Sequence, residues 1–249
     1  EDQRLHLIIY IDNFNLKPFD RNRVLREVRA FVSQKVHKGD SVMLVTYDRE
    51  LHVRRPFTTD AQSIASATFE LEKVSAQGVS AESDRRDLLR DINDADNYAS
   101  VAGRVRAYAE SMSNDLAFTV SSLKDFVGSL AGLPGRKALL YVSDGLPMRP
   151  AEDIYYVLQD KFKEQVSLLE TQEWDASRKF QELAADANAN RITFYTIDAA
   201  GLRAASSADV ENNAPSVAFI DTVTNGNVQA PLQMLAESTG GMAILNTNN

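Results

Sequence analysis

The sequence predicts an α/β fold in which helices cover both faces of a doubly wound, mostly parallel sheet of six strands. Two apolar runs, Leu5–Asp12 and Lys137–Asp144, carry this prediction, because runs that are apolar on both faces are typical of buried parallel strands. Segments of helical periodicity alternate with such runs along the chain, as a doubly wound sheet requires. Both runs end in an aspartate, and ligands of open α/β sheets bind beyond the carboxyl ends of the strands. Asp12 and Asp144 therefore indicate this edge of the sheet, which we call the rim, as the working face.

The remaining strands are predicted from short apolar runs bounded by turn residues. The run 40–48 follows Gly39, a residue type that commonly ends a helix. The run 51–58 alternates apolar and polar residues, which predicts an antiparallel partner at the edge of the sheet. The predicted strands span, in chain order, residues 5–12, 40–48, 51–58, 137–144, 191–198 and 242–245.

Apolar residues at every third or fourth position predict the helices. The stretch 101–131 keeps this spacing from Val101 to Leu130 and stops at Gly132-Leu-Pro-Gly135. The stretch 152–188 has the same spacing, and we expect an interruption near Glu173. The predicted helices span residues 23–36, 60–74, 101–131, 152–188 and 231–239.

The two long helices exceed the strand that lies between them in the chain. At a rise of about 1.5 Å per residue they would run about 45 and 55 Å, against about 20 Å for a strand of six residues. Their overhanging parts need an apolar partner, and the nearest one is the other helix. The sequence thus predicts a long helical hairpin that projects from the sheet, with Leu116 and Leu169 in its core. Trp174 either packs between these helices or is exposed as a binding anchor.

No repeat, low-complexity tract or Pro/Gly linker divides the chain, so residues 1–249 are expected to form a single domain. Two segments are interpreted as insertions: 77–103, which is polar with a short helical pattern, and 201–230. The second contains Asn225-Gly226 between strand-like runs, which predicts a β-hairpin with a type I′ turn.

Composition argues against several classes of function. The 249 residues carry a formal charge of −8 and a pI near 5.0, and no Lys/Arg cluster is interleaved with aromatics, so we expect no nucleic-acid partner. No apolar run reaches the roughly 18 residues of a membrane span. Without cysteine, the chain has neither disulfides nor thiolate metal sites. Because it opens on Glu1 rather than Met, we expect an excised piece of a longer protein.

Two segments, Leu130–Leu146 and Ala189–Leu202, resemble bacterial proteins related to the von Willebrand factor type A (VWFA) domain, of the kind found in acidobacteria and their relatives. The order of the predicted elements also resembles the VWFA fold, with an aspartate after the first strand, an edge hairpin and an Asp-Gly pair after the fourth strand. The resemblance covers nearly the whole chain except 77–101 and 204–230. It implies a Rossmann-like fold, protein binding and a secreted or periplasmic location.

The resemblance also implies a metal-ion-dependent adhesion site at the rim, where a DxSxS motif, a threonine and a second aspartate hold a divalent ion. Asp12 and Asp144 match the two aspartates, but Phe14 and Leu16 stand where the serines should be. Hard cations such as Mg²⁺ want oxygen ligands, and these two side chains supply none. We therefore expect a degenerate site without a cofactor. The alternative is a remodelled site that still holds Mg²⁺ through Asp12 and Asp144.

Polar residues that follow the two strands are the candidates for partner binding at the rim. They are Asp12, Asn13, Asn15, Ser143, Asp144 and Gly145. A plainer interpretation is that each aspartate caps the following helix or bonds loop amides, as Asp often does after a strand. Phe14 and Leu16 are either turned into the core or exposed as an apolar anchor for a partner.

The enzymatic alternative is a phosphoaspartyl hydrolase of the dehalogenase type, which uses an aspartate nucleophile and a second acid two residues later. Phe14 stands at the position of that acid. His6, His37 and His52 have no Ser or Asp partners in a catalytic arrangement and are interpreted as structural or solvated. We therefore predict a non-enzymatic protein–protein interaction or adhesion module that has no catalytic residue and binds a protein partner of unknown identity.

Overall fold

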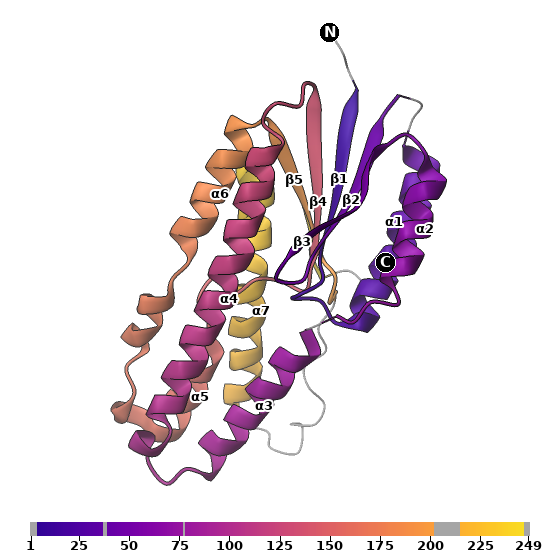
Figure 1. Cartoon of the computed structure of the whole chain (residues 1–249). Helices are drawn as coiled ribbons and strands as arrows, with labels where there is room; N and C mark the ends of the chain where they lie inside the picture. The colour runs from indigo at the N-terminus through magenta and orange to yellow at the C-terminus, as the bar shows by residue number, and fades with distance from the viewer. Residues whose placement is uncertain (1–3, 37–38, 77, 202–214, 247–249) are drawn as a thin grey trace.

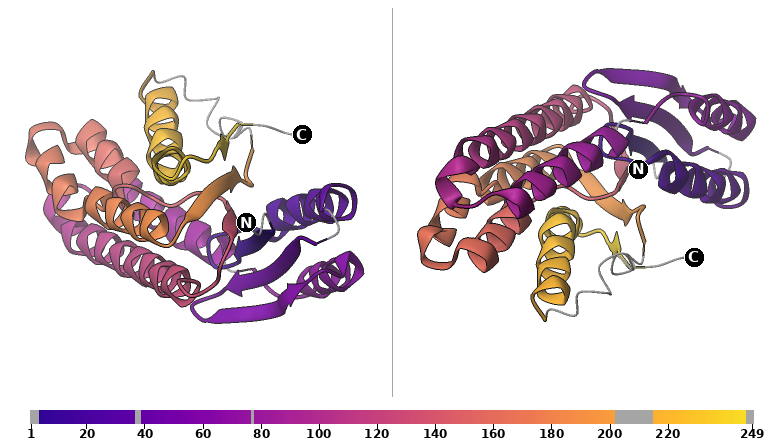
Figure 2. Two further views of the ribbon diagram at one scale, coloured as in Figure 1. Left: turned by 90° about the horizontal axis from the view of Figure 1, so that it is seen from above. Right: turned by 90° about the horizontal axis from the view of Figure 1, so that it is seen from below.

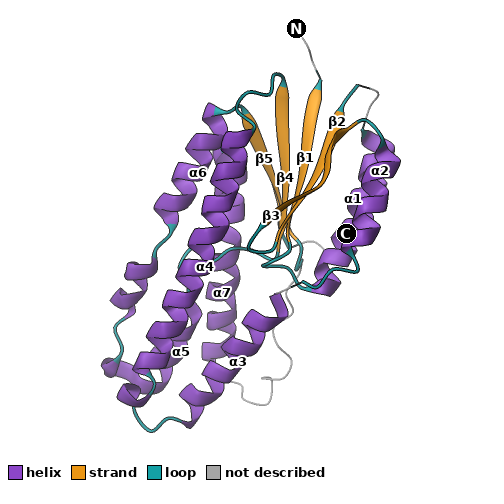
Figure 3. Cartoon of the chain, viewed as in Figure 1, coloured by secondary structure: helices purple, strands orange, loops and turns teal. Residues whose placement is uncertain are grey.

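The computed structural model describes residues 4–36, 39–76, 78–201 and 215–246. A single six-stranded sheet in the order β3-β2-β1-β4-β5-β6 has helices on both faces (Figures 1 and 3). The strands are β1 Leu5–Asp12, β2 Ser41–Tyr47, β3 Leu51–Thr58, β4 Arg136–Ser143, β5 Ile192–Asp198 and β6 Ala243–Ile244. All neighbouring strands are parallel except β2 and β3, which are antiparallel. The predicted α/β fold, with its one antiparallel edge strand, is confirmed.

The helices of the described residues alternate with the strands. They are α1 Pro18–Lys35, α2 Ala61–Leu71, α3 Gly78–Asp94, α4 Ala102–Ser129, α5 Glu152–Phe162, α6 Ser177–Ala189 and α7 Pro215–Ser238. Short 3₁₀ helices are η1 Tyr98–Ser100, η2 Lys163–Gln165 and η3 Leu168–Trp174. None of the described helices combines the length and the apolar composition that crossing a membrane requires.

Two apolar layers hold the sheet between the helices. On one face, side chains of α4, α6 and α7, such as Leu123, Phe180 and Leu232, pack against β1 and β4. On the other face, α1 and α2 pack against β1 and β2, with Leu25 and Ile64 fully buried. Because β1 is covered on both faces, its residues from Leu7 to Ile11 are all hydrophobic.

A third apolar cluster lies beyond the sheet. In Figure 1, α3, α4, α5 and part of α7 extend past the carboxyl ends of the strands. The inward faces of α3, α4 and α5, which include Leu88, Val105, Tyr155 and Leu158, form the third cluster. We call this projecting part the overhang.

The overhang is a bundle of several helices rather than the predicted two-helix hairpin. α4 continues over 28 residues as expected, but the stretch 152–188 is broken into α5, η2, η3 and α6. The break begins at Phe162, because Lys163 takes a positive φ of 51°, and α6 restarts where Asp175 accepts the amide of Ser177 at 2.8 Å. The break also places Leu169 on the surface, where it is 70% exposed, whereas Leu116 is buried as predicted.

Two further segments are helical where the sequence predicted something else. Residues 78–94 form the 17-residue helix α3, where only a short helical pattern had been expected. Asn225 and Gly226 lie inside α7, so the predicted type I′ hairpin is wrong. The local Asn-Gly signal is overridden because Leu232 and Leu235, on the same helix, bury themselves against the sheet. The rest of the predicted insertion, 202–214, lies outside the described residues, as does His37.

Candidate functional site

Asp12 closes β1 at the rim and is fully buried. Its Oδ2 accepts hydrogen bonds from the Tyr141 hydroxyl at 2.6 Å and the Asn15 Nδ2 at 2.8 Å, and lies 3.2 Å from the Ser143 hydroxyl. Its Oδ1 accepts the Asn15 amide at 3.3 Å. Burial raises the pKa of this carboxyl, although the hydrogen bonds from Tyr141, Asn15 and Ser143 oppose the shift. Asn15 lies in the loop after β1, whereas Tyr141 and Ser143 lie in β4. The carboxylate of Asp12 therefore joins β4 to the loop after β1.

Asn13 and Arg21 hold the residues that follow α2 against the rim by hydrogen bonds. Asn13 is fully buried, and its Oδ1 accepts a hydrogen bond from the Arg21 guanidinium at 2.7 Å. The guanidinium, 1% exposed, also donates to the carbonyls of Val74 at 2.8 Å and Glu72 at 3.2 Å. The Asn13 Nδ2 donates to the carbonyl of Ser75 at 2.9 Å. Arg21 therefore satisfies the carbonyls at the end of α2 and holds that segment beside the rim.

Phe14 and Leu16, at the positions of the missing serines, are turned inward. Leu16 is fully buried in the layer under α1, and Phe14 is partly buried edge-on to Tyr47 at 6.3 Å between ring centroids. Of the two alternatives for these residues, the structure therefore supports burial in the core. The carbonyl of Leu16 accepts the amide of Gly78 at 3.1 Å, so α3 starts directly against this loop. A side-chain Cβ at Gly78 would lie 2.8 Å from the Leu16 carbonyl, which explains the glycine there.

Asp144 fixes the start of α1. Its Oδ2 accepts the amide of Lys17, the residue before the helix, at 2.9 Å. Lys17 is the N-cap residue and its side chain forms no cap, but its own amide is bound by Asp144, which directly follows β4. These contacts, with those of Asp12, fit the interpretation in which the two aspartates bond loop amides.

α7 covers the rim on the side of β4. Its Pro231 has no amide hydrogen to donate to the carbonyl of Asn227 four residues earlier. The amide of Met148 bonds that carbonyl instead, at 3.0 Å, and the amide of Leu146 bonds the carbonyl of Val228 at 3.1 Å. Gly145 has a φ of +102°, and a Cβ there would lie 2.7 Å from the Val228 carbonyl. α7 is thus docked through its own backbone onto the loop after β4.

Asn227 strengthens this contact with a reciprocal pair of hydrogen bonds. Its Oδ1 accepts the amide of Arg149 at 2.7 Å, and its Nδ2 donates to the Arg149 carbonyl at 2.8 Å. Sequence reasoning missed Asn227, Tyr141 and Arg21. The signal for Asn227 was Pro231, because a proline inside a helix leaves a carbonyl four residues earlier that another group must satisfy.

The residues at the rim do not fit a magnesium site of the VWFA pattern. Phe14 and Leu16 supply no oxygen, and the oxygens of Asp12 are bonded by Tyr141, Asn15 and Ser143. Within the described ranges, no group of three or more His, Asp or Glu side chains is placed to hold a metal ion.

The two described histidines have ordinary structural partners. The His6 Nδ1 lies 2.6 Å from the Ser41 hydroxyl, at the end of β1 opposite the rim. The His52 Nε2 lies 2.9 Å from the Asp48 carboxylate at the turn between β2 and β3. Neither ring contacts Asp12.

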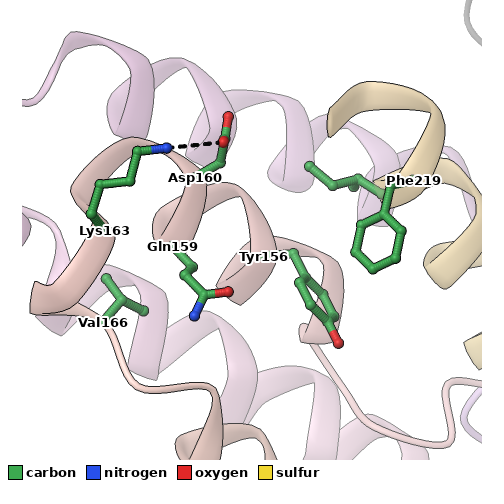
Figure 4. A pocket seen from close by; sticks show the side chains of 7 residues that line it. Tyr156, Gln159, Asp160, Lys163, Val166 and Phe219 are labelled. Atoms are coloured by element: carbon green, nitrogen blue, oxygen red, sulfur yellow. Dashed lines mark hydrogen bonds and ion pairs between the residues drawn. The ribbon is translucent and has the colours of Figure 1, made fainter. Parts of the chain in front are cut away.

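The overhang carries a separate shallow pocket of about 450 Å³ between α5 and α7 (Figure 4). Tyr156 and Phe219 meet edge-on at 5.5 Å between centroids, and Lys163 pairs with Asp160 at 3.2 Å beside them. Trp174 lies elsewhere in the overhang, partly buried against the third cluster and 5.8 Å below the Arg106 guanidinium. It is therefore packed among the helices, as the first of its two interpretations predicts.

Of the predicted rim residues, Asp12, Asn13, Ser143 and Gly145 are buried, while Asn15 and Asp144 are partly exposed. The rim brings all of them together, as expected from the register in which Asp12 pairs with Tyr47 and Ser143 with Asp198. α3 and α7 lie against its loops, so a partner would reach the buried members only if one of these helices moved away. Their role in partner binding stays a prediction.

Comparison with known proteins finds structural likenesses at low sequence identity. No family model matches the chain, and no curated protein is similar to it in sequence. A three-domain portion of the type V pili tip protein Mfa5 from Porphyromonas gingivalis aligns at 10% identity and a TM-score of 0.48, over 98% of this chain and 47% of that one. An aerotolerance-related membrane protein from Bacteroides fragilis, carrying multiple mutations to serines, aligns at 14% identity and a TM-score of 0.46, covering 98% and 92%. The conserved hypothetical protein BatB from Bacteroides thetaiotaomicron aligns at 12% identity and a TM-score of 0.43, covering 98% and 91%. At these distances neither family nor function follows from the likeness.

Proposed function

We propose that this chain is a non-enzymatic protein-interaction module of the VWFA type whose metal site is degenerate. The observation that carries the proposal is the burial and hydrogen bonding of the Asp12 carboxylate. Its carboxylate is fully buried and accepts hydrogen bonds from Tyr141 and Asn15, so it is engaged in holding the rim together. A metal ligand or a nucleophile at this position would need an oxygen directed at an open site.

The proposal predicts that divalent cations leave the stability of the chain unchanged. A ligand that binds only the native state at a hundredfold excess over its Kd stabilises it by about 2.7 kcal/mol. Melting temperatures measured in millimolar Mg²⁺ and in EDTA should therefore coincide. A rise with Mg²⁺ that disappears in Asp144→Ala would instead establish the alternative, a remodelled site that still holds Mg²⁺.

The competing enzymatic function is phosphoester hydrolysis with Asp12 as nucleophile. The acid two residues later would contribute about 10² to 10⁴ in rate, and Phe14 replaces it. We therefore expect only background turnover of an aryl phosphate in the presence of Mg²⁺. Turnover that is lost in Asp12→Asn would overturn the choice of class.

We further propose, from the sequence resemblance alone, that the module works outside the cytoplasm. A fusion of its natural gene product to an alkaline phosphatase that is active only after export tests this location. An inactive but stable fusion would contradict it.

A further inference from the structure

β3 forms one edge of the sheet, and no described strand pairs with its outer side. Both views in Figure 2 place it at the end of the sheet opposite β6. Proteins usually protect such an edge with charged side chains, proline or a β-bulge, because its unpaired backbone groups can pair with another strand. The second half of β3 has all three, in Arg54, Arg55, Pro56 and a register shift against β2. The first half, residues 51–53, has no Arg, Lys, Pro or bulge.

The backbone groups of Leu51 and Val53 point away from the sheet. The Tyr47 carbonyl accepts the amide of Phe14 at 3.0 Å, on the side of β1, so the backbone groups of Tyr47 face away from β3. Tyr47 pairs with Leu51, and this is therefore a pair that exchanges no hydrogen bonds in the antiparallel ladder. Because the two kinds of pair alternate, the amides and carbonyls of Leu51 and Val53 face the free edge, whereas those of His52 face β2.

The side chains of the same two residues are apolar and exposed. Leu51 and Val53 pair with Tyr47 and Val45 of β2, which belong to the apolar layer under α4, so both side chains lie on that face. Leu51 is 36% exposed and Val53 is 51% exposed. Leu51 also lines a hollow of about 430 Å³ with Phe118 of α4, which is 68% exposed. This part of the edge therefore offers both a free backbone and an apolar surface to another strand.

The charges on either side of the segment are complementary under a two-fold rotation. Glu50 precedes it, is exposed and forms no ion pair within the described residues. Arg54 follows it, with a side chain 31% exposed. When a second β3 runs antiparallel with His52 opposite His52, Glu50 of each copy lies beside Arg54 of the other. Leu51 then faces Val53 of the other copy, and their outward backbone groups are placed to exchange hydrogen bonds.

We propose that β3 pairs with β3 of a second copy through residues 50–54, so that two sheets join into one across a two-fold axis at His52. Apolar and opposite-charge pairs across neighbouring strands both stabilise a sheet. The symmetry supplies each kind of pair twice, next to the Phe118 side chain of either copy. The inference goes beyond the proposed function and does not rest on it, because it uses neither the rim nor Mg²⁺.

Like charges do not prevent this register. It brings Arg49 of one copy towards Arg55 of the other, but each is already paired within its own copy, with Asp115 at 3.0 Å and with Glu70 at 3.5 Å. The net charge of −8 repels two copies, although physiological salt largely screens charges that are more than about 8 Å apart. The short segment therefore predicts a reversible dimer whose population rises with concentration.

A strand from elsewhere is a poorer occupant of this edge. It could bond the backbone of Leu51 and Val53, but a second copy necessarily brings the Glu50 and Arg54 that complement this edge. The described chain leaves the sheet through β6, at the opposite edge. A second copy is therefore the occupant for which the sequence of the edge itself provides the matching residues.

Cysteine cross-linking tests the register, since the chain has no cysteine of its own. In the proposed dimer the two Cα atoms at position 52 form a pair without hydrogen bonds, about 4.5 Å apart and within disulfide range. His52→Cys should therefore give a disulfide-linked dimer under mild oxidation. Arg55→Cys is the matched control, because the Arg55 side chain is 33% exposed against 39% for His52. Two copies of residue 55 would lie about 20 Å apart along the paired strands and should not link.

A mixture of Leu51→Cys and Val53→Cys chains should link more than either variant alone, because only the mixture places two cysteines opposite each other. Equal linking of His52→Cys and Arg55→Cys would indicate random collision and would overturn the proposal. The same follows if His52→Cys links in this chain but not in a longer natural form, because another part of that polypeptide then covers the edge.

Sedimentation equilibrium measures the affinity. Val53→Arg should raise the dissociation constant of the dimer by about tenfold or more, because it places a charge in both apolar pairs. Tyr195→Arg, at a residue 37% exposed on β5, should leave the constant unchanged. A chain that stays monomeric at millimolar concentration contradicts the proposal, as does a dimer that Tyr195→Arg dissociates and Val53→Arg does not.

Exchanging the charges tests the ion pairs. Glu50→Arg alone and Arg54→Glu alone each bring like charges together in a homodimer, so each should dimerise less than the unmodified chain. Mixing the two variants restores opposite charges at both places, and the heterodimer should form more readily than either homodimer. A mixture that behaves as the sum of its parts rules out this register. Melting curves check that each variant folds, and the cysteine variants keep the test decisive if a charge variant does not.

Discussion

Burial raises the pKa of the Asp12 carboxyl above its ordinary value of 3.8, so its charge opposes folding at neutral pH. Between that value and the folded-state pKa, the native state binds more protons than the unfolded state. The contribution of Asp12 to stability is therefore full at low pH and is lost as the pH rises through the folded-state pKa.

We accordingly expect Asp12→Asn, which has no proton to lose, to change the pH dependence of stability. The free energy of unfolding of the unmodified chain, minus that of the variant, should fall as the pH rises from about 4 to 7. Urea denaturation at several pH values measures it, with the exposed Asp96→Asn as a control that should leave the profile unaltered. A difference that does not change with pH would contradict a raised pKa of Asp12.

Two glycines provide a matched pair of residues for testing the dock of α7 on the rim. Gly145 has a positive φ and faces the Val228 carbonyl, whereas Gly103 lies in α4, where an added Cβ would have no neighbouring atom within 4 Å. Gly145→Ala should lower the free energy of unfolding by about 1 to 3 kcal/mol or more, through strain and displacement of α7. Gly103→Ala, in the first turn of α4, should raise it by up to about 0.5 kcal/mol, because alanine is a better helix former than glycine. Denaturation curves of the two variants that move in the same direction would argue against this dock.

At the scale of elements, the central strands could be predicted to within a residue or two because their position dictates their composition. β1 is covered on both faces, so every residue from Leu7 to Ile11 is hydrophobic, and such a continuous run predicts a buried strand whatever its neighbours are. α4 was predictable for a similar reason, since it keeps one apolar stripe along its whole length.

The elements that failed depend on distant segments. Asn225-Gly226 favours a turn locally, and only the burial of Leu232 and Leu235 against the sheet makes the stretch helical. Likewise, the positions of Asp12 and Asp144 at the rim followed from the strand pattern, but their partners did not. The Tyr141 hydroxyl is 129 residues from Asp12 in the chain, and Lys17 is 127 residues from Asp144, separations that no local pattern encodes.

The break between α5 and α6 gives a test at this scale. Truncating a buried leucine to alanine costs about 2 to 5 kcal/mol, whereas an exposed one costs within about 0.5 kcal/mol. Leu116→Ala, 4% exposed on α4, should therefore destabilise the chain clearly, and Leu169→Ala, 70% exposed on η3, should not. Comparable losses in chemical denaturation would mean that the stretch is a continuous packed helix after all.

At the scale of the whole molecule, the rim separates two differently built parts. The sheet and its two apolar layers lie on one side of the rim, and the overhang with its own apolar cluster lies on the other. At the rim, Asp12 bonds Tyr141 of β4, Arg21 of α1 bonds Asn13 in the loop after β1, and Asn227 of α7 bonds Arg149 in the loop after β4. A surface that other folds of this class leave open to ligands is thus occupied here by the chain's own α3 and α7.

One side of β5 and β6 carries exposed apolar side chains, Tyr195 and Ile244, which bear on how copies of the chain behave in solution. With a net charge of −8 near pH 7, copies repel one another and keep these exposed side chains apart. Close to the isoelectric point, near pH 5.0, that repulsion vanishes while the apolar surface remains. Light scattering should then rise with concentration in the unmodified chain and less so in Tyr195→Arg, and equal scattering would place the adhesive surface elsewhere. Shelf life and crystallisation would accordingly depend on keeping the solution well away from that acidity.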